Sequence, residues 1–197
     1  MAKHNGHGQA AVLTNAQVAK IRRTMKQPHH KLMFDIAIWT GERWGAIIQL
    51  RVDDVYQDSV RAIPHKLITY RAITRKAGAG GKRETRQVPV HQELEDILRA
   101  YRPPQYGYLF PNKKTGRHLT YQACSQAFAK ALERANLSHI GASPHSTRHT
   151  FITKLNAAGV SLPVMQKLTG HKNIRTLANY VAISPEVLNG AIHAIHF

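Results

Sequence analysis

The chain has 197 residues, of which 28 are Lys or Arg and 11 are Asp or Glu, so its formal charge is +17 with the 13 His residues counted as neutral. This length fits one domain, and the apolar residues come in short runs such as 34–39 rather than a stretch of roughly 20, which excludes a membrane-spanning helix. The single cysteine, Cys124, excludes a disulfide framework and favours a reducing, cytoplasmic setting. So high a positive charge favours a polyanionic partner, with nucleic acid ahead of an anionic membrane.

The first predicted element is a helix that follows a flexible lead-in over residues 1–13. Thr14 and Gln17 have the spacing of a capping box, and Pro28 is expected to end the helix. Apolar residues at helical spacing, together with caps and prolines, predict further helices over residues 30–40, 44–48, 91–102, 121–135, 145–158, 161–170, 176–180 and 185–195.

Short strands are predicted where β-branched and aromatic residues gather, over 55–56, 60–63, 67–73 and 86–90. Between the last two strands, residues 77–81 hold three Gly and two Ala, which predicts a mobile hairpin tip. The elements together predict an α+β fold. One mostly helical domain over 14–183 should contain a small antiparallel sheet with a β-hairpin, followed by a helical tail over 184–197.

Residues suited to chemistry on a phosphodiester occur near both ends of this domain. Arg43 follows a predicted helix end and is flanked by apolar residues, so its guanidinium should be partly enclosed. His145 and Arg148 are three residues apart in a predicted helix and therefore share a face. His171 follows a glycine, and Tyr180 comes nine residues later.

These residue types have complementary roles at a phosphate. Arginine presents a planar fork that matches two phosphate oxygens, and histidine moves protons near neutral pH. A tyrosine can attack as an oxygen nucleophile, although its ordinary pKa of about 10 means that nearby positive charge must favour the phenolate. Two arginines would supply that charge and would stabilise the transition state.

The ordered set of these segments resembles the tyrosine recombinase family, of the phage-integrase type, from about residue 14 to 188. The matching boxes are Thr40-Gly41-Glu42-Arg43, Thr74-Arg75-Lys76, His145-Ser146-Thr147-Arg148-His149, and Leu168-Thr169-Gly170-His171 followed by Tyr180. Residues 86–90 resemble the strand that closes the hairpin of this family. Each box alone is weak, but their order and separations are specific.

The resemblance implies that DNA strands are cut and rejoined without a metal or another cofactor. Tyr180 would attack the scissile phosphate and become joined to the 3′ phosphate, while Arg43 and Arg148 would clamp the non-bridging oxygens. Reversal with a new 5′ hydroxyl would complete strand exchange. The event could be integration, excision or inversion.

The resemblance also implies which residues move protons. Lys76 would protonate the departing 5′ oxygen, with Lys82 as the alternative in the same loop. His145 would assist proton transfer, and His171 would hydrogen-bond the phosphate or support the approach of the tyrosine. His145 and His149 are four residues apart, but neither a third ligand nor a general-base glutamate accompanies them, so no metal site is predicted.

Two features depart from the family. The acidic residue usually found three positions after the first arginine is replaced by Ala46, which leaves the support of Arg43 in question, although Glu42 precedes that arginine. Only about 13 residues precede the first predicted helix, whereas most family members carry a separate N-terminal clamp domain. The sequence is therefore expected to be a catalytic domain almost alone.

Double-stranded DNA is the expected partner. Between residues 61 and 90 there are eight Lys or Arg and one acidic residue, which is either a solvated face or a surface for the DNA backbone. The residues expected to contact DNA are Arg75, Lys82, Arg83, Arg86, Lys172 and Arg175. The apolar stripe of the tail could pack on its own domain or on a neighbouring protomer, and a homo-oligomer, a tetrameric synapse on DNA, is expected from the resemblance.

Three other functions remain open from the sequence. A type IB topoisomerase would use the same residues as a monomer and would not need two sites. A telomere-resolving enzyme would leave closed hairpin ends. A catalytically silent DNA-binding remnant would bind without cutting, and Ala46 and the missing clamp domain keep this alternative open.

Overall fold

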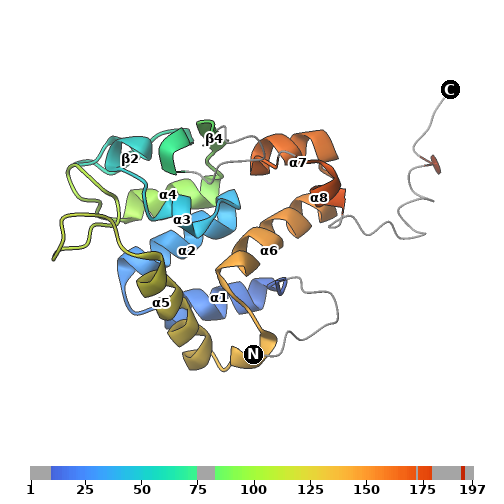
Figure 1. Cartoon of the computed structure of the whole chain (residues 1–197), viewed down its shortest axis with the longest axis horizontal. Helices are drawn as coiled ribbons and strands as arrows, with labels where there is room; N and C mark the ends of the chain where they lie inside the picture. Colours follow the sequence, from blue (N-terminus) through green and yellow to red (C-terminus); the bar gives the residue numbers. More distant parts are fainter. Residues whose placement is uncertain (1–9, 75–82, 172, 179–191, 194–197) are drawn as a thin grey trace.

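A computed structural model of the chain describes residues 10–74, 83–171, 173–178 and 192–193. Its helices, shown in Figure 1, are α1 (Asn15–Thr24), α2 (Pro28–Thr40), α3 (Trp44–Ile47), α4 (Gln92–Ala100), α5 (Tyr121–Arg134), α6 (Pro144–Ala157), α7 (Leu162–Thr169) and α8 (Arg175–Ala178). Its strands are β1 (Tyr56–Asp58), β2 (Ile63–Pro64), β3 (Leu67–Tyr70) and β4 (Arg86–Pro89), and short 3-10 helices cover η1 (Val52–Asp54), η2 (Ala72–Thr74) and η3 (Ser138–Ile140). The α+β fold class is confirmed. The predicted hairpin tip at 77–81 lies outside the described residues, as does all of the predicted tail except 192–193.

Helix α2 is the centre of the fold. Apolar residues occupy most of its circumference, and its side chains from Leu32 to Ile38 are buried, which is the pattern of a helix enclosed on all sides. Helices α1, α3, α4, α5 and α6 all pack against it. Figure 1 shows α1 and α5 on one side of α2 and the strands with α4 on the other.

The strands form two antiparallel pairs rather than the single small sheet that was expected. β1 pairs with β2, and β3 pairs with β4 in a register that sets Leu67 opposite Pro89 and Tyr70 opposite Arg86. The predicted strand over 60–63 begins only at Ile63, because Ala62 has a left-handed φ of 53° that belongs to the turn between β1 and β2. Strand β3 is shorter than predicted, since η2 follows it.

The capping box predicted for the first helix is present, but the end predicted for that helix is wrong. Thr14 and Gln17 form the capping box of α1, with side-chain to backbone hydrogen bonds in both directions. That helix ends at Thr24 rather than at Pro28, which is instead the first residue of α2. Proline is favoured at this position because the missing N–H has no partner within a helix anyway.

Buried apolar side chains form two clusters of very different size. The main cluster surrounds α2 and takes side chains from α1, α3, the strands, α4 and α5. The small cluster consists of Ile152, Met165 and Leu177, with partly buried neighbours, and it fastens α7 and α8 to α6. The apolar packing of the segment that leads to His171 is therefore that of the small cluster. In the described part of the chain, no helix combines the length and the apolar character needed to cross a membrane.

Candidate active site

Arg148 brings three of the sequence boxes together. It lies in α6, which begins with Pro144 and a capping box, and its side chain is 7% exposed. One terminal nitrogen donates to the carbonyl oxygen of Gly41 at 2.7 Å, and the other donates to that of Thr169 at 2.9 Å. Because these carbonyls belong to the ends of α2 and α7, Arg148 holds the first and last boxes against its own box, which is the third.

Arg43 is placed beside this centre by the short helix α3. It is the N-cap residue of α3 and is partly buried, and its backbone N–H donates to a carboxylate oxygen of Glu42 at 2.7 Å. The next residue, Trp44, is buried, and its indole N–H donates to the hydroxyl of Thr147 in α6 at 3.2 Å. This contact ties the two arginine-bearing helices to each other.

The turn before Arg43 has a backbone shape that favours glycine. Gly41 has a φ of 61°, in the left-handed region, and it ends α2. A Cβ at this position would overlap the ring of Phe151 in α6. The close approach of α2 to α6 beside the site therefore depends on glycine at position 41.

His171 lies against Arg148 as a half-buried imidazole. Its Nδ1 is 2.6 Å from the hydroxyl of Thr169, and one terminal nitrogen of Arg148 lies 3.2 Å from both Nδ1 and Nε2. The Thr169 hydroxyl already donates to the carbonyl of Met165, so it accepts from His171. We therefore assign the proton to Nδ1, which leaves Nε2 as an acceptor for Arg148.

The charge state of His171 follows from the same surroundings. Burial, followed by the positive charges of Arg148, Arg43 and Arg86, lowers the pKa of His171 to about 4. The imidazole is thus neutral at pH 7 and serves as a hydrogen-bonding group rather than a cation. Arg148, Arg43 and Arg86 therefore all lie close enough to His171 for their charges to act on its ring.

The other predicted histidine has a different environment. His145 is exposed in the first turn of α6, one turn before the buried Arg148. His149 is partly buried in the same helix, and burial lowers its pKa. Among the residues that the structure describes, no group of three or more His, Cys, Asp or Glu side chains could hold a metal ion.

A buried ion pair, which the sequence did not predict, lies next to Arg43. Arg86, expected to contact DNA, is 7% exposed on β4, and its Nη2 lies 2.8 Å from a carboxylate oxygen of Glu42, which is 1% exposed. The guanidinium therefore points inward, and the expectation of a solvent-facing contact is corrected. A signal existed in the sequence, because Arg86 alternates with Val88 and so shares its buried strand face.

The remaining predicted residues divide into two sets. Arg83 and Arg175 are described and exposed, as expected of residues that contact a partner, and Arg83 donates to the carbonyl of Ile73. Five predicted residues lie outside the described part of the chain: Arg75, Lys76, Lys82, Lys172 and Tyr180.

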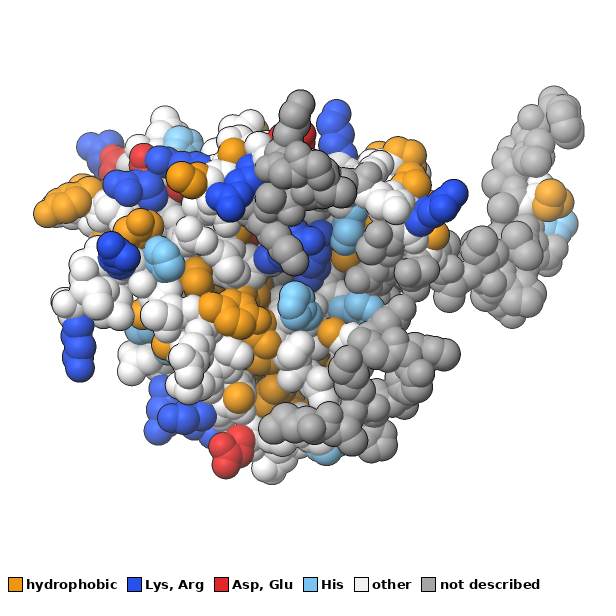
Figure 2. Space-filling model, in the orientation of Figure 1, with side chains coloured by type: hydrophobic (Ala, Val, Ile, Leu, Met, Phe, Trp, Pro, Cys, Tyr) orange, Lys and Arg blue, Asp and Glu red, His pale blue; other side chains and the backbone are white. Residues whose placement is uncertain are grey.

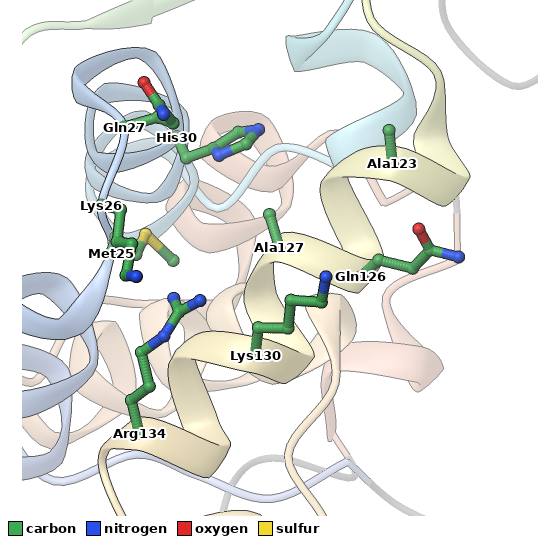
Figure 3. A pocket seen from close by; sticks show the side chains of 9 residues that line it. All are labelled: Met25, Lys26, Gln27, His30, Ala123, Gln126, Ala127, Lys130 and Arg134. Atoms are coloured by element: carbon green, nitrogen blue, oxygen red, sulfur yellow. The ribbon is translucent and has the colours of Figure 1, made fainter.

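A basic groove is a second feature that the sequence analysis missed. It runs between α5 and the segment that joins α1 to α2, and Lys26, His30, Lys130 and Arg134 line it without any acidic side chain (Figure 3). Lys130 and Arg134 are four residues apart and share a face of α5, which is a signal that could have identified it. On the face shown in Figure 2, Lys and Arg side chains are widespread and acidic ones are few.

The fold and the convergence of Arg43, Arg148 and His171 are those expected of the tyrosine recombinase class. The chain belongs to the phage integrase family, which it matches over residues 11–186. It is 30% identical over 150 residues to the tyrosine recombinase XerC of Erythrobacter litoralis, in an alignment that covers 75% of this chain and 46% of that protein.

Solved structures share the fold at lower identity. The catalytic domain of bacteriophage HP1 integrase is similar with a TM-score of 0.66 and 22% identity, over 94% of this chain and 95% of that one. The XerH site-specific recombinase bound to its difH substrate is similar with a TM-score of 0.69 and 20% identity, over 93% of this chain and 53% of that one. The chain spans about half the length of the curated relatives it matches.

Proposed function

We propose that this chain is a site-specific DNA recombinase whose catalytic domain, residues 14–183, cuts and rejoins DNA through a covalent 3′-phosphotyrosine. The observation that carries the proposal is the position of Arg148. Its hydrogen bonds to Gly41 and Thr169 bring the segments bearing Arg43 and His171 to one place. Two guanidinium groups beside a neutral imidazole suit a phosphate that gains negative charge during reaction.

The proposed reaction is a transesterification at phosphorus. The Tyr180 hydroxyl loses its proton, its oxygen forms a bond to the scissile phosphorus, and the bond from phosphorus to the 5′ oxygen breaks. Lys76 donates a proton to that leaving oxygen, and Arg43 and Arg148 stabilise the charge on the non-bridging oxygens. A 5′ hydroxyl from a second strand then attacks the phosphotyrosine, which restores the tyrosine and rejoins DNA.

The two histidines take different parts in this proposal. His171 is neutral at pH 7 because burial and the neighbouring arginines lower its pKa to about 4, so it orients groups by hydrogen bonds. His145 is exposed at the first turn of α6 and is free of the packing that encloses His171. It is therefore the histidine that we propose to assist proton transfer once DNA covers the site.

Double-stranded DNA is the proposed partner, bound by a homo-oligomer that pairs two sites in a tetrameric synapse. The exposed Arg83 and Arg175, together with the basic groove beside α5, supply positive surface for the DNA backbone. The tail at 184–197 is proposed to link protomers. Its deletion should abolish DNA-dependent assembly while the rest of the chain still folds, and unchanged assembly would contradict this part of the proposal.

The deciding experiment is covalent trapping on a nicked DNA duplex, in which the cleaved strand cannot be rejoined. The wild type should yield a protein–DNA adduct on a denaturing gel, and Tyr180→Phe should yield none, because the nucleophilic oxygen is missing. DNA binding by both proteins, measured by gel shift, serves as the control.

The same system separates the other candidate functions. An adduct on single sites with relaxation of supercoiled DNA would favour a type IB topoisomerase, and closed hairpin ends would favour a telomere-resolving enzyme. A folded protein that binds DNA and forms no adduct would be a catalytically silent binding module, and the proposed cleavage would then be wrong.

A further inference from the structure

The ion pair between Glu42 and Arg86 connects three segments that all lead into the candidate active site. Glu42 precedes Arg43 in the first box, and Arg86 lies on β4, the returning strand of the predicted hairpin. Arg86 also donates to the carbonyl of Leu168, at the end of α7 and close to His171. One guanidinium thus joins the hairpin strand to the first and the last boxes.

Each end of the pair is held in place by further contacts. One carboxylate oxygen of Glu42 lies 2.8 Å from Nη2 of Arg86, and the other accepts the backbone N–H of Arg43 at 2.7 Å. The Arg86 guanidinium lies 5.5 Å from the centre of the Tyr70 ring. The Tyr70 hydroxyl in turn lies 2.9 Å from that of Thr40, which belongs to the same box as Glu42.

Burying this pair is costly, and stability alone does not account for it. The free-energy cost of removing two charges from water offsets much of their attraction. In many proteins, apolar residues of similar size stabilise a core equally well. Glu42 and Arg86 are nevertheless 1% and 7% exposed. What a charged pair adds over an apolar one is direction, because its hydrogen bonds aim particular groups at one another.

From this geometry we infer that Glu42 and Arg86 are positioning residues, which hold Arg43 and the turn bearing His171 in register for reaction at the phosphate. This inference rests on the proposed function. It also accounts for the missing acidic residue at position 46, where Ala46 is buried in α3 and carries no carboxylate. The carboxylate beside the first arginine comes instead from position 42, on the other side of Arg43.

The test replaces the pair with apolar residues of similar size, in the double variant Glu42→Leu/Arg86→Met. The replacement removes both members of the pair, so neither charge is left buried without the other. Folding should therefore be retained while the directed contacts to Arg43 and Leu168 are lost. The matched control is Arg22→Met/Asp35→Leu. That pair also has a buried carboxylate, at 2.7 Å from the Arg22 guanidinium, but it joins α1 to α2.

Cleavage of the nicked duplex at saturating DNA separates positioning from packing. The Glu42–Arg86 double variant should bind DNA within about threefold of the wild type, and its rate of adduct formation should fall by about 10- to 100-fold. The control pair should keep the wild-type rate. A double variant that folds and cleaves at the wild-type rate would show that the pair only fills space, and the inference would be overturned.

A second measurement, on the protein without DNA, does not depend on cleavage. Nuclear Overhauser contacts between the ring protons of His171 and Arg148 report position rather than the charge of Arg86. They should weaken in the Glu42–Arg86 double variant and stay unchanged in the control pair, because Arg86 is bonded to the segment before His171. If the wild type forms no adduct, the proposed function fails while this measurement still decides the positioning. Unchanged His171 contacts in the double variant would overturn it.

Discussion

At the scale of single residues, burial decides what the candidate site can do. Arg148 keeps its charge in a buried position because two backbone carbonyls accept its hydrogen bonds. His171 responds differently, since an imidazole can give up its proton where a guanidinium cannot. The site therefore combines permanent positive charge with a neutral ring at physiological pH.

The protonation of His171 leads to a prediction about pH. Its pKa in the folded protein is about 4, below its ordinary value of 6.5, so the unfolded chain binds a proton at a higher pH than the folded one. The contribution of neutral His171 to stability is complete above 6.5 and is lost as the pH falls toward 4. NMR titration of the ring should give a midpoint near 4.

Thermal unfolding supplies the control for this titration. Between pH 7 and pH 4 the Tm of the wild type should fall further than that of His171→Asn, since asparagine does not titrate in this range. Equal falls in the two proteins would contradict the prediction.

Gly41 is the position where a single methyl group should be most harmful to the site. Gly41→Ala adds left-handed strain and an overlap with Phe151, so the free energy of unfolding should drop by about 2–5 kcal/mol. Gly159→Ala is the matched control, because Gly159 also has a positive φ but has open space around its Cβ direction. It should lose only about 1–2 kcal/mol. Denaturant unfolding measures both, and equal losses would exclude the overlap as the cause.

At the scale of elements, the two apolar clusters divide the site between a firm part and a weakly held part. Arg43 and Arg148 are carried by α3 and α6, which flank the central helix α2. The segment bearing His171 follows α7, whose buried apolar contacts are those of the small cluster. Few buried apolar contacts mean a low free energy of local opening, so α7 and α8 should open without the rest of the domain.

Hydrogen exchange on a pair of methionine variants tests this division. Met165 and Met33 are both 0% exposed, but Met165 belongs to the small cluster and Met33 to the main one. Met165→Ala should lower the free energy of opening of α7 amides by about 2–5 kcal/mol and leave α2 amides nearly unchanged. Met33→Ala should lower the free energies of opening of both α2 and α7 amides. A Met165→Ala variant that weakens α2 and α7 alike would show that the domain opens as one unit.

At the scale of the whole molecule, the charge of +17 is the dominant property. Acidic side chains such as Asp35, Asp54 and Glu95 are ion-paired with nearby basic residues, so they do not form a negative surface of their own. Lys and Arg side chains are scattered over the face seen in Figure 2, where acidic ones are few. Binding to a polyanion should therefore depend strongly on salt.

DNA binding measured as a function of salt tests this electrostatic part. If roughly 6 to 10 phosphates are neutralised, affinity should fall by about three to five orders of magnitude between roughly 50 and 200 mM salt. Arg83→Gln and Arg175→Gln should each reduce the slope by about 0.9. Arg99→Gln should leave the slope unchanged, because Arg99 is already paired with Glu95. A wild-type slope near zero would contradict the expected backbone contacts.

Local signals in the sequence predict local structure well, and their failures have identifiable causes. The capping box of Thr14 and the left-handed glycines at 41 and 170 lie where the sequence places helix ends. Pro28 begins α2 instead of ending the first helix, because a proline can follow one helix or begin the next. The two strand pairs were merged in the prediction, since residue composition does not specify which strands pair.

The sequence by itself determined the family, the order of the boxes, the candidate residues and the excess of positive charge, because these depend on residue identity and spacing along the chain. Only the tertiary structure decided that Arg86 turns inward to Glu42, that Arg148 lies between Gly41 and Thr169, and that His171 is neutral at pH 7. Each of these depends on burial and on contacts between distant segments. A charge that is buried without a partner costs free energy, and only the packing of the folded chain decides which partner is within reach.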